Sequence, residues 1–330
     1  MTTPSRAPIG SAVLFAVATL VALGLLTAAV AIVGPLPASP APTLPPEPAA
    51  PPSTKPGLTV RVTSILALLD ALANNEVTEI IVADGTYPVS RAGLQAPDSL
   101  WIGARYAGRT NPVTVRAETT GGVTIDGGGS TNFGGLSFDE GAHDQTWDGF
   151  VFANGSPTQT GVVTFGGYVG MPGAHHITLR NLTFLASLTG SATSASAPAT
   201  DHAIYVSKAA GGPHDLVFED ITVDGRGGLA SAVQFYGHDD GSPNAWNVWV
   251  RRLTVTGTQQ GIIIWDSTLH DIVVDGATVT GALSCGVRYE LPGRSIFLAN
   301  VTTTGSGERG FQSSFGRNPP GITFVNTSFH

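Results

Sequence analysis

The stretch of sequence that decides the fold is residues 253–305, LTVTGTQQGIIIWDSTLHDIVVDGATVTGALSCGVRYELPGRSIFLANVTTTG. One short pattern occurs in it three times, as LTVTG at 253–257, ATVTG at 277–281 and VTTTG at 301–305, and an earlier copy is ITVDG at 221–225. The last glycines of these four copies are 32, 24 and 24 residues apart. A period of this length indicates a solenoid, in which each repeat is one structural unit that stacks on the next.

Two further sets of segments run in phase with this pattern. The first set is AIYVSK, AVQFYG, GIIIWD, GVRYEL and GFQSSF, which begin at Ala203, Ala232, Gly261, Gly286 and Gly310. The second set, HDLVFED, WNVWVRR, HDIVVDG, RSIFLAN and GITFVNT, fits between them. Each period therefore supplies about three short strands, separated by residues that favour bends. Stacked turns would pair each strand in parallel with its copy one turn on, about 4.8 Å away.

This pattern resembles the right-handed parallel β-helix proteins of the pectate-lyase-like superfamily, over roughly residues 60 to 330. A short amphipathic helix, ILALLDALANN after Ser64, and the following EIIVADGTY resemble that superfamily's N-terminal cap and first turn. RYAGRTNPVTVRAETTGGVTIDG resembles the next turns in its alginate-lyase and chondroitinase-like branch. The resemblance implies an all-β fold, a single-stranded right-handed parallel β-helix with a short N-terminal capping helix.

The N-terminal part of the chain predicts where the protein is located. Residues 12–33 form an uncharged apolar run that is long enough, as a helix, to cross the roughly 30 Å hydrocarbon core of a membrane. Arg6 before it favours a cytoplasmic N-terminus and an exported remainder. The length favours an uncleaved anchor, and cleavage as a signal segment stays an alternative, so the protein is either anchored at the cell membrane or secreted.

The residues that follow are proline-dense and predict a semi-rigid tether that acts as a passive spacer. We therefore divide the chain into a cytoplasmic N-terminus (1–11), a transmembrane anchor or signal segment (12–33), a Pro-rich linker (34–57) and the β-helix domain (58–330).

Charge and cysteine content exclude some partners. The chain has 16 basic and 24 acidic side chains, and its formal net charge is -8. Because the basic residues are scattered without a run, we expect no nucleic-acid partner. The single cysteine, Cys285, excludes an internal disulfide and a zinc site built from several cysteines.

Because side chains alternate along a strand, the first set of segments predicts which residues face the core and which face outward. We expect the inward residues to be Ile204, Val206, Val233, Phe235, Ile262, Ile264, Val287, Tyr289, Phe311 and Ser313. One outward column should be Tyr205, Gln234, Ile263, Arg288 and Gln312, and the neighbouring column Ser207, Tyr236, Trp265, Glu290 and Ser314.

Aromatic rings beside amides and charged groups suit a polysaccharide, because sugar C–H faces pack on rings while hydroxyls need hydrogen-bond partners. The expected substrate-binding residues are Tyr205, Gln234, Tyr236 and Trp265. Packing of Tyr236 and Trp265 beneath a loop stays an equal alternative.

Three kinds of chemistry stay open for this face. A polysaccharide lyase, which the resemblance favours, needs a base and a cation. The matching residues are Lys208, His202, Tyr205 and Arg288. A glycoside hydrolase would use two carboxyls, here Asp266 and Glu290. A non-catalytic carbohydrate-binding or surface protein would need neither.

Calcium is the one cofactor that the sequence suggests. Asp239 and Asp240, in HDDG, are candidate calcium ligands, although a simple turn explains them as well.

Several residues are predicted to be structural. His175, His176, His214 and His270 stand just before strands or at their beginnings, and we interpret them as turn residues that lie too many turns apart to share a metal. Asn181, Asn300 and Asn326 should adopt left-handed bends that hydrogen-bond between turns. GITFVNTSFH, at 321–330, predicts an open last turn and, through it, a homo-oligomer.

Overall fold

The structure is a computed structural model, and it describes residues 43–49, 57–89, 100–103, 109–127, 135–155, 161–166, 172–186, 202–207, 212–226, 229–237, 244–316 and 318–330. The expected transmembrane or signal segment 12–33 lies outside these residues, as does most of the linker 34–57. Within the described part of the chain, no helix is long and apolar enough to cross a membrane.

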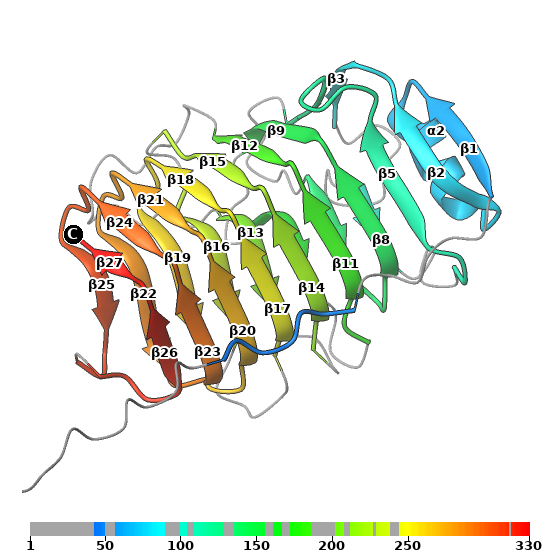
Figure 1. Ribbon diagram of the computed structural model, residues 1–330. Coiled ribbons are helices and arrows are strands. Elements are labelled where there is room, and N and C mark those ends of the chain that lie inside the picture. The colour runs from blue at the N-terminus through cyan, green and yellow to red at the C-terminus, as the bar shows by residue number, and fades with distance from the viewer. Residues whose placement is uncertain are drawn as a thin grey trace, which may run out of the picture. The chain divides into compact units, whose positions relative to one another are not determined.

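The strands form three parallel sheets, which we call sheets A, B and C (Figure 1). Sheet A consists of β1 (Leu58–Val62), β2 (Val77–Val82), β5 (Val113–Ala117), β8 (His143–Asp148), β11 (His175–Arg180), β14 (His214–Glu219), β17 (Trp246–Arg251), β20 (His270–Asp275), β23 (Arg294–Ala299) and β26 (Ile322–Val325). Sheet B consists of β3 (Gly85–Pro88), β6 (Val123–Asp126), β9 (Phe150–Gly155), β12 (Thr183–Ala186), β15 (Thr222–Asp224), β18 (Thr254–Thr256), β21 (Thr278–Thr280), β24 (Thr302–Thr304) and β27 (Ser328–Phe329). Sheet C consists of β4 (Leu100–Ile102), β7 (Leu136–Phe138), β10 (Gly161–Phe165), β13 (His202–Ser207), β16 (Ser231–Tyr236), β19 (Gln260–Trp265), β22 (Cys285–Leu291) and β25 (Arg309–Ser313).

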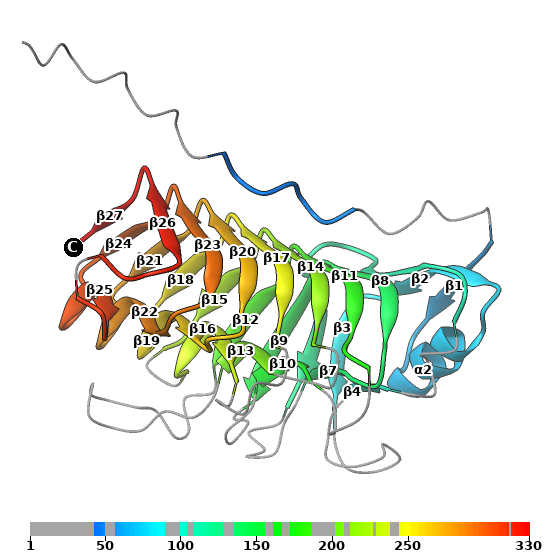
Figure 2. The same cartoon turned by 90° about the horizontal axis from the view of Figure 1, so that it is seen from below.

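From β2 onward the chain visits the three sheets in the order A, B, C and then returns to A, so each full turn adds one strand to each sheet (Figure 2). Every strand pairs in parallel with its counterpart on the adjacent turn, as Val233 with Ile262 and Ile262 with Val287 show on sheet C. The predicted parallel coil with three strands per turn is confirmed, and so is the register of its inward column Val233, Ile262, Val287 and Phe311.

The inward side chains of the stacked turns form one continuous hydrophobic core. All of the predicted inward residues of β13, β16, β19 and β22 are buried, namely Ile204, Val206, Val233, Phe235, Ile262, Ile264, Val287 and Tyr289. Phe311 and Ser313 were expected to be buried too, but both are only half-buried. The reason is that β25 is the edge strand of sheet C, so they have a neighbouring turn on one side only.

Bends between sheets A and B use residues in the left-handed region. Asn181, Asn300 and Asn326 have φ values of 54°, 51° and 50°. The Asn181 and Asn300 amides donate to Asp148 and Asp275 on the adjacent turn, at 2.8 and 2.7 Å. The prediction of structural asparagines is therefore confirmed, because a short amide tolerates this conformation and bonds between turns.

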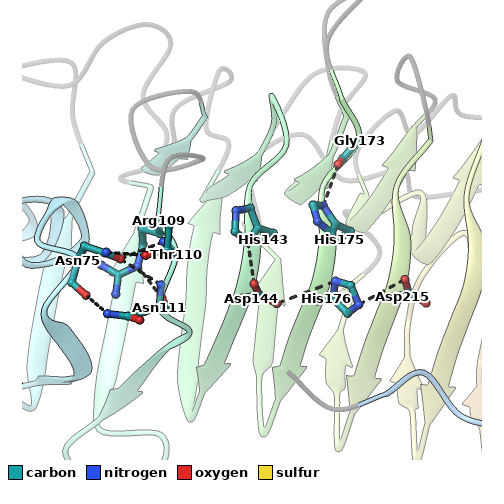
Figure 3. Close-up of polar contacts among 10 residues, drawn as sticks. All are labelled: Asn75, Arg109, Thr110, Asn111, His143, Asp144, Gly173, His175, His176 and Asp215. Atoms are coloured by element: carbon teal, nitrogen blue, oxygen red, sulfur yellow. Dashed lines mark hydrogen bonds and ion pairs between the residues drawn. The ribbon is translucent and has the colours of Figure 1, made fainter. Parts of the chain in front are cut away.

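The N-terminal end of the coil is covered by the expected helix, α2 (Ile65–Ala73), whose N-cap is Ser64. Buried Arg109 holds the other end of the helix in place. Its guanidinium donates to the carbonyl oxygens of Leu72 and Val77, at 2.6 and 2.5 Å. The neighbouring Thr110 and Asn111 hydrogen-bond with Asn75, just after the helix (Figure 3). Because the last carbonyls of a helix lack partners within it, this arginine stabilises the junction between α2 and β2.

Candidate functional site

The predicted outward residues of sheet C lie side by side on adjacent strands. Tyr205 pairs with Gln234, which pairs with Ile263, and Ile263 pairs with Arg288. In the neighbouring column Ser207 pairs with Tyr236 and Tyr236 with Trp265.

Glu290 was expected to continue this second column, and that expectation is wrong. A bulge in β22 places Leu291, not Glu290, opposite Trp265. The extra residue brings the Glu290 carboxylate back toward Arg288 of the same strand.

A row of rings runs across these strands. Tyr205 and Tyr236 stack with ring centroids 6.2 Å apart, and Tyr236 meets Trp265 edge to face at 5.9 Å. The Arg288 guanidinium lies 5.0 Å from the centroid of the Trp265 ring. All three rings are half-buried. Trp265 therefore already has a cation over its ring, so a sugar would pack against the exposed remainder of the row.

Arg288 and Glu290 form an ion pair beside Trp265. The Nε atom of Arg288 donates to Oε1 of Glu290 at 2.5 Å, and the Ser314 hydroxyl donates to the other carboxylate oxygen. Burial acts to raise the pKa of Glu290, but these two hydrogen bonds outweigh it and hold the pKa below its ordinary value. Glu290 is therefore an ionised acceptor at neutral pH and is unsuited to donate a proton as a general acid.

His202 lies at the end of the aromatic row but is not open to a ligand. Only 7% of it is exposed, its ring stacks on Tyr205 at 5.3 Å, and its Nδ1 atom lies 2.8 Å from the Ser231 hydroxyl. Burial lowers the pKa of the imidazole from 6.5 to about 3. Burial also raises the pKa of Tyr205 to about 12. The structure thus places His202 as a neutral packed ring, which corrects its expected role as an exposed base.

Asp266 was expected to form half of a carboxyl pair on the outer face, but it is only 1% exposed. Its carboxylate accepts hydrogen bonds from the Asn244 amide at 2.9 Å and from the backbone N–H and hydroxyl of Thr268 at 2.5 and 2.7 Å. This is the pattern of a carboxylate that fixes a turn. Gln234 is also buried although it points outward, so it is less available to a ligand than predicted.

Lys208, Asp239 and Asp240 lie outside the described residues. Within the described part of the chain, no group of three or more His, Cys, Asp or Glu side chains is arranged to hold a metal ion. Calcium at Asp239 and Asp240 stays a prediction.

A second cluster, on the outside of sheet A, was not foreseen. His143, His175, His214, Trp246 and His270 occupy the same position in five adjacent strands, and their rings stack with centroids 5.1, 5.0, 4.2 and 5.9 Å apart in that order. His143, His175 and His214 lie on consecutive turns and stack, because adjacent turns of the coil are only one strand spacing apart, whereas His270 lies two turns from His214, beyond Trp246. That these histidines do not share a metal stays a prediction. Burial, with the neighbouring imidazoles His214 and His143, lowers the pKa of His175.

At the next position of three of these strands, β8, β11 and β14, the residue alternates between aspartate and histidine. His176 lies between the carboxylates of Asp144 and Asp215, at 3.9 and 3.6 Å, as Figure 3 shows. All three residues have positive φ and lie inside β8, β11 and β14, so the interpretation of His176 as a turn residue before a strand is corrected to a left-handed position within a strand. The recurrent dipeptides HD, HH and HD, one turn apart, were the sequence signal for this cluster.

Stacked turns of three parallel strands around one core define a parallel β-helix. No protein-family model matches the sequence, and no curated protein matches it. Among solved structures, a doubly substituted pectate lyase from Xanthomonas campestris is similar, with a TM-score of 0.52 and 12% identity over 82% of this chain and 79% of that chain. A singly substituted pectate lyase from the same bacterium gives a TM-score of 0.50 at the same identity and coverage. An alginate lyase from a Paenibacillus species, at a TM-score of 0.43 and 13% identity over 82% of this chain and 97% of that chain, is less similar. The two pectate lyase likenesses show that the chain has a parallel β-helix fold like theirs.

Proposed function

We propose that the protein engages an extracellular polysaccharide along the outer face of sheet C. The observation that carries this proposal is the half-buried row Tyr205, Tyr236 and Trp265 on consecutive strands, which ends at the Arg288–Glu290 pair. Adjacent parallel strands lie about 4.8 Å apart, so a row across four strands is roughly 14 Å long and matches a few linked sugar rings.

Arg288 favours an anionic polysaccharide. A guanidinium binds a carboxylate through two parallel hydrogen bonds, and the Arg288 guanidinium lies over the Trp265 ring, where a sugar packed on the row would meet it. Glu290 would accept a hydroxyl hydrogen bond from the same ligand.

Lyase chemistry is the reaction that we propose for this face. In β-elimination a base takes the proton beside the uronate carboxylate, whose charge a cation neutralises. The electron pair left behind forms a carbon–carbon double bond as the C–O bond to the next sugar breaks, and the leaving oxygen takes up a proton from water. Arg288 would supply the cation and Lys208 the base. The environments of His202 and Tyr205 make them poor bases near neutral pH, since one pKa is lowered to about 3 and the other is raised to about 12.

A non-catalytic binding protein is the second candidate. It is favoured by the same burial of His202 and by the commitment of Asp266 to a turn. The environment of Asp266 also weakens the glycoside hydrolase alternative. Asp266 is buried and its hydrogen bonds are made within the protein, so it is not available as one of two catalytic carboxyls.

The test compares polygalacturonate, alginate and a neutral glucan as ligands of the full chain. Binding is followed by calorimetry and elimination by the ultraviolet absorbance of unsaturated products. We expect Arg288→Ala to weaken binding of the anionic polymers about tenfold or more and Trp265→Ala to weaken all binding. Arg294→Ala, at an exposed arginine on sheet A, is the matched control. Unchanged binding in both sheet C variants would place the site elsewhere.

We also propose that the domain is exported and held at the membrane by residues 12–33, or secreted if they are cleaved. Cell fractionation, with the mass of the mature N-terminus, tests both outcomes. Recovery of the whole chain in the cytoplasmic fraction would contradict export.

A further inference from the structure

The outer face of sheet A changes character along the coil. In β5, β8 and β11 the outward residue at one paired position is threonine, and in the next four strands it is apolar. The column reads Thr114, Thr146, Thr178, Val217, Trp249, Val273 and Phe297. We call Val217, Trp249, Val273 and Phe297 the apolar patch.

The apolar patch is covered although it points away from the core. Val217 and Val273 are buried, and Trp249 is only 5% exposed. The Arg251 guanidinium lies 4.5 Å from the centroid of the Trp249 ring and covers part of it. An outward tryptophan reaches so low an exposure only beneath further groups, since its neighbours in the sheet cover only its sides.

Residues 43–49, TLPPEPA, lie on this part of the sheet. The segment runs along the outside of sheet A, across β14, β17 and β20 (Figures 1 and 2). Pro48 is buried and Leu44 and Pro45 are half-buried. Glu47 forms a bidentate pair with Arg251, with both N–O distances at 2.7 Å.

An apolar patch with an aromatic ring, next to an arginine and covered by a proline-rich segment, has the features of a recognition site for a proline-rich peptide segment. A proline-rich segment is extended before it binds, so it loses little conformational entropy on docking, and it suits a groove lined by aromatic side chains. The same guanidinium contacts the ring of Trp249 and the carboxylate of Glu47, so the charge contact and the apolar contact are made at one place.

We propose that the apolar patch with Arg251 is a docking site for an acidic proline-rich segment, and that its occupant is this chain's own residues 43–49. The Pro-rich linker is then a strap fixed to the coil, which replaces its interpretation as a passive spacer. The docking site is on sheet A and is independent of the polysaccharide face on sheet C.

The test places a nitroxide spin label on the strap of the full chain, at Ala49→Cys, an exposed position. The native Cys285 is buried, and burial raises its pKa to about 11, so it stays unlabelled. We expect the label to tumble with the coil in the otherwise unchanged chain. Arg251→Gln and Glu47→Gln should each raise the fraction of mobile spin label about two- to fivefold. This range corresponds to the small free energy that one exposed ion pair, Glu47–Arg251, contributes to docking.

Two further variants make the result specific. Arg252→Gln is the matched control, because this exposed arginine pairs with Glu219 and Asp220 on the adjacent turn rather than with the strap, and should leave the label immobile. Val273→Thr restores the residue type of the earlier turns and should mobilise the label while the coil stays folded. A label that is mobile from the start, or equal effects of Arg251→Gln and Arg252→Gln, would overturn the docking site. A mobile fraction that rises on dilution would show that the strap comes from a second copy, and would overturn the intramolecular assignment.

Discussion

Side chains that point out of sheet C reach very different depths. Trp265 is half-buried, whereas Gln234, Ile263 and His202 are buried. Alternation along a strand predicts the side that a residue faces, and it did so correctly here, but depth depends on what the turns and loops place over the strand. For that reason the sequence predicted the columns of the candidate site and not which of their members a ligand can reach.

His202 makes the stability of the protein depend on pH. Its pKa is about 3 in the folded state and about 6.5 when unfolded, so below pH 6.5 the unfolded chain binds a proton that the folded chain does not. This part of the stability is present above pH 6.5 and is lost as the pH falls toward 3. Between pH 7 and pH 5 the protein should lose about 2 kcal/mol through this group.

Urea unfolding at pH 7 and pH 5 measures this loss. We expect His202→Gln to lose about 2 kcal/mol less than the unchanged protein over this interval, because glutamine does not titrate. His330→Gln, at an exposed histidine, is the control. Equal pH dependence in the unchanged protein and His202→Gln would show that His202 is not buried in this way.

At the scale of the strands, the period of the sequence was enough to predict the three sheets and their register. The bulge in β22 was not predictable, because turns already differ in length by several residues and one more leaves no mark on the spacing. The stacked histidines of sheet A could have been predicted, since their dipeptides recur at the same place in each turn. Their stacking was not predicted because the histidines are one or more turns apart along the chain, and the short distance between adjacent turns of the coil, about 4.8 Å, was not considered.

A charge placed inside the central strands should prevent folding. Ile262 in β19 is fully buried and pairs with Val233 and Val287, so Ile262→Asp would leave a carboxylate in the core without a partner. Thr254→Asp, at an exposed position of β18, is the control. We expect soluble, cooperatively melting protein by circular dichroism for the control alone. A folded Ile262→Asp protein would contradict the inward assignment.

At the scale of the whole molecule, the polysaccharide face and the strap lie on different sheets. If residues 12–33 anchor the chain, we expect docking at 43–49 to shorten the stretch of linker between that anchor and the coil from 34–57 to 34–42.

The partly exposed phenylalanines of the last described turn lead us to expect self-association. Phe311, Phe324 and Phe329 cluster there with ring centroids 5.1 to 5.8 Å apart, all three half-buried, and Phe315 is 40% exposed. We expect sedimentation to show a dimer that Phe315→Ser weakens. Leu66→Ser, at an exposed leucine of α2, should leave it unchanged. A monomer at all concentrations would contradict this contact.

Hydroxyl-radical footprinting of the full chain, with and without an oligosaccharide of the polymer that binds, tests most directly that the ligand lies on sheet C. Trp265 on sheet C and Trp246 on sheet A are both half-buried, so each reports on its own face under the same conditions. We expect the ligand to protect Trp265, Tyr236 and Tyr205 and to leave Trp246 unchanged. Protection of Trp246 with no change at Trp265 would contradict the proposed site.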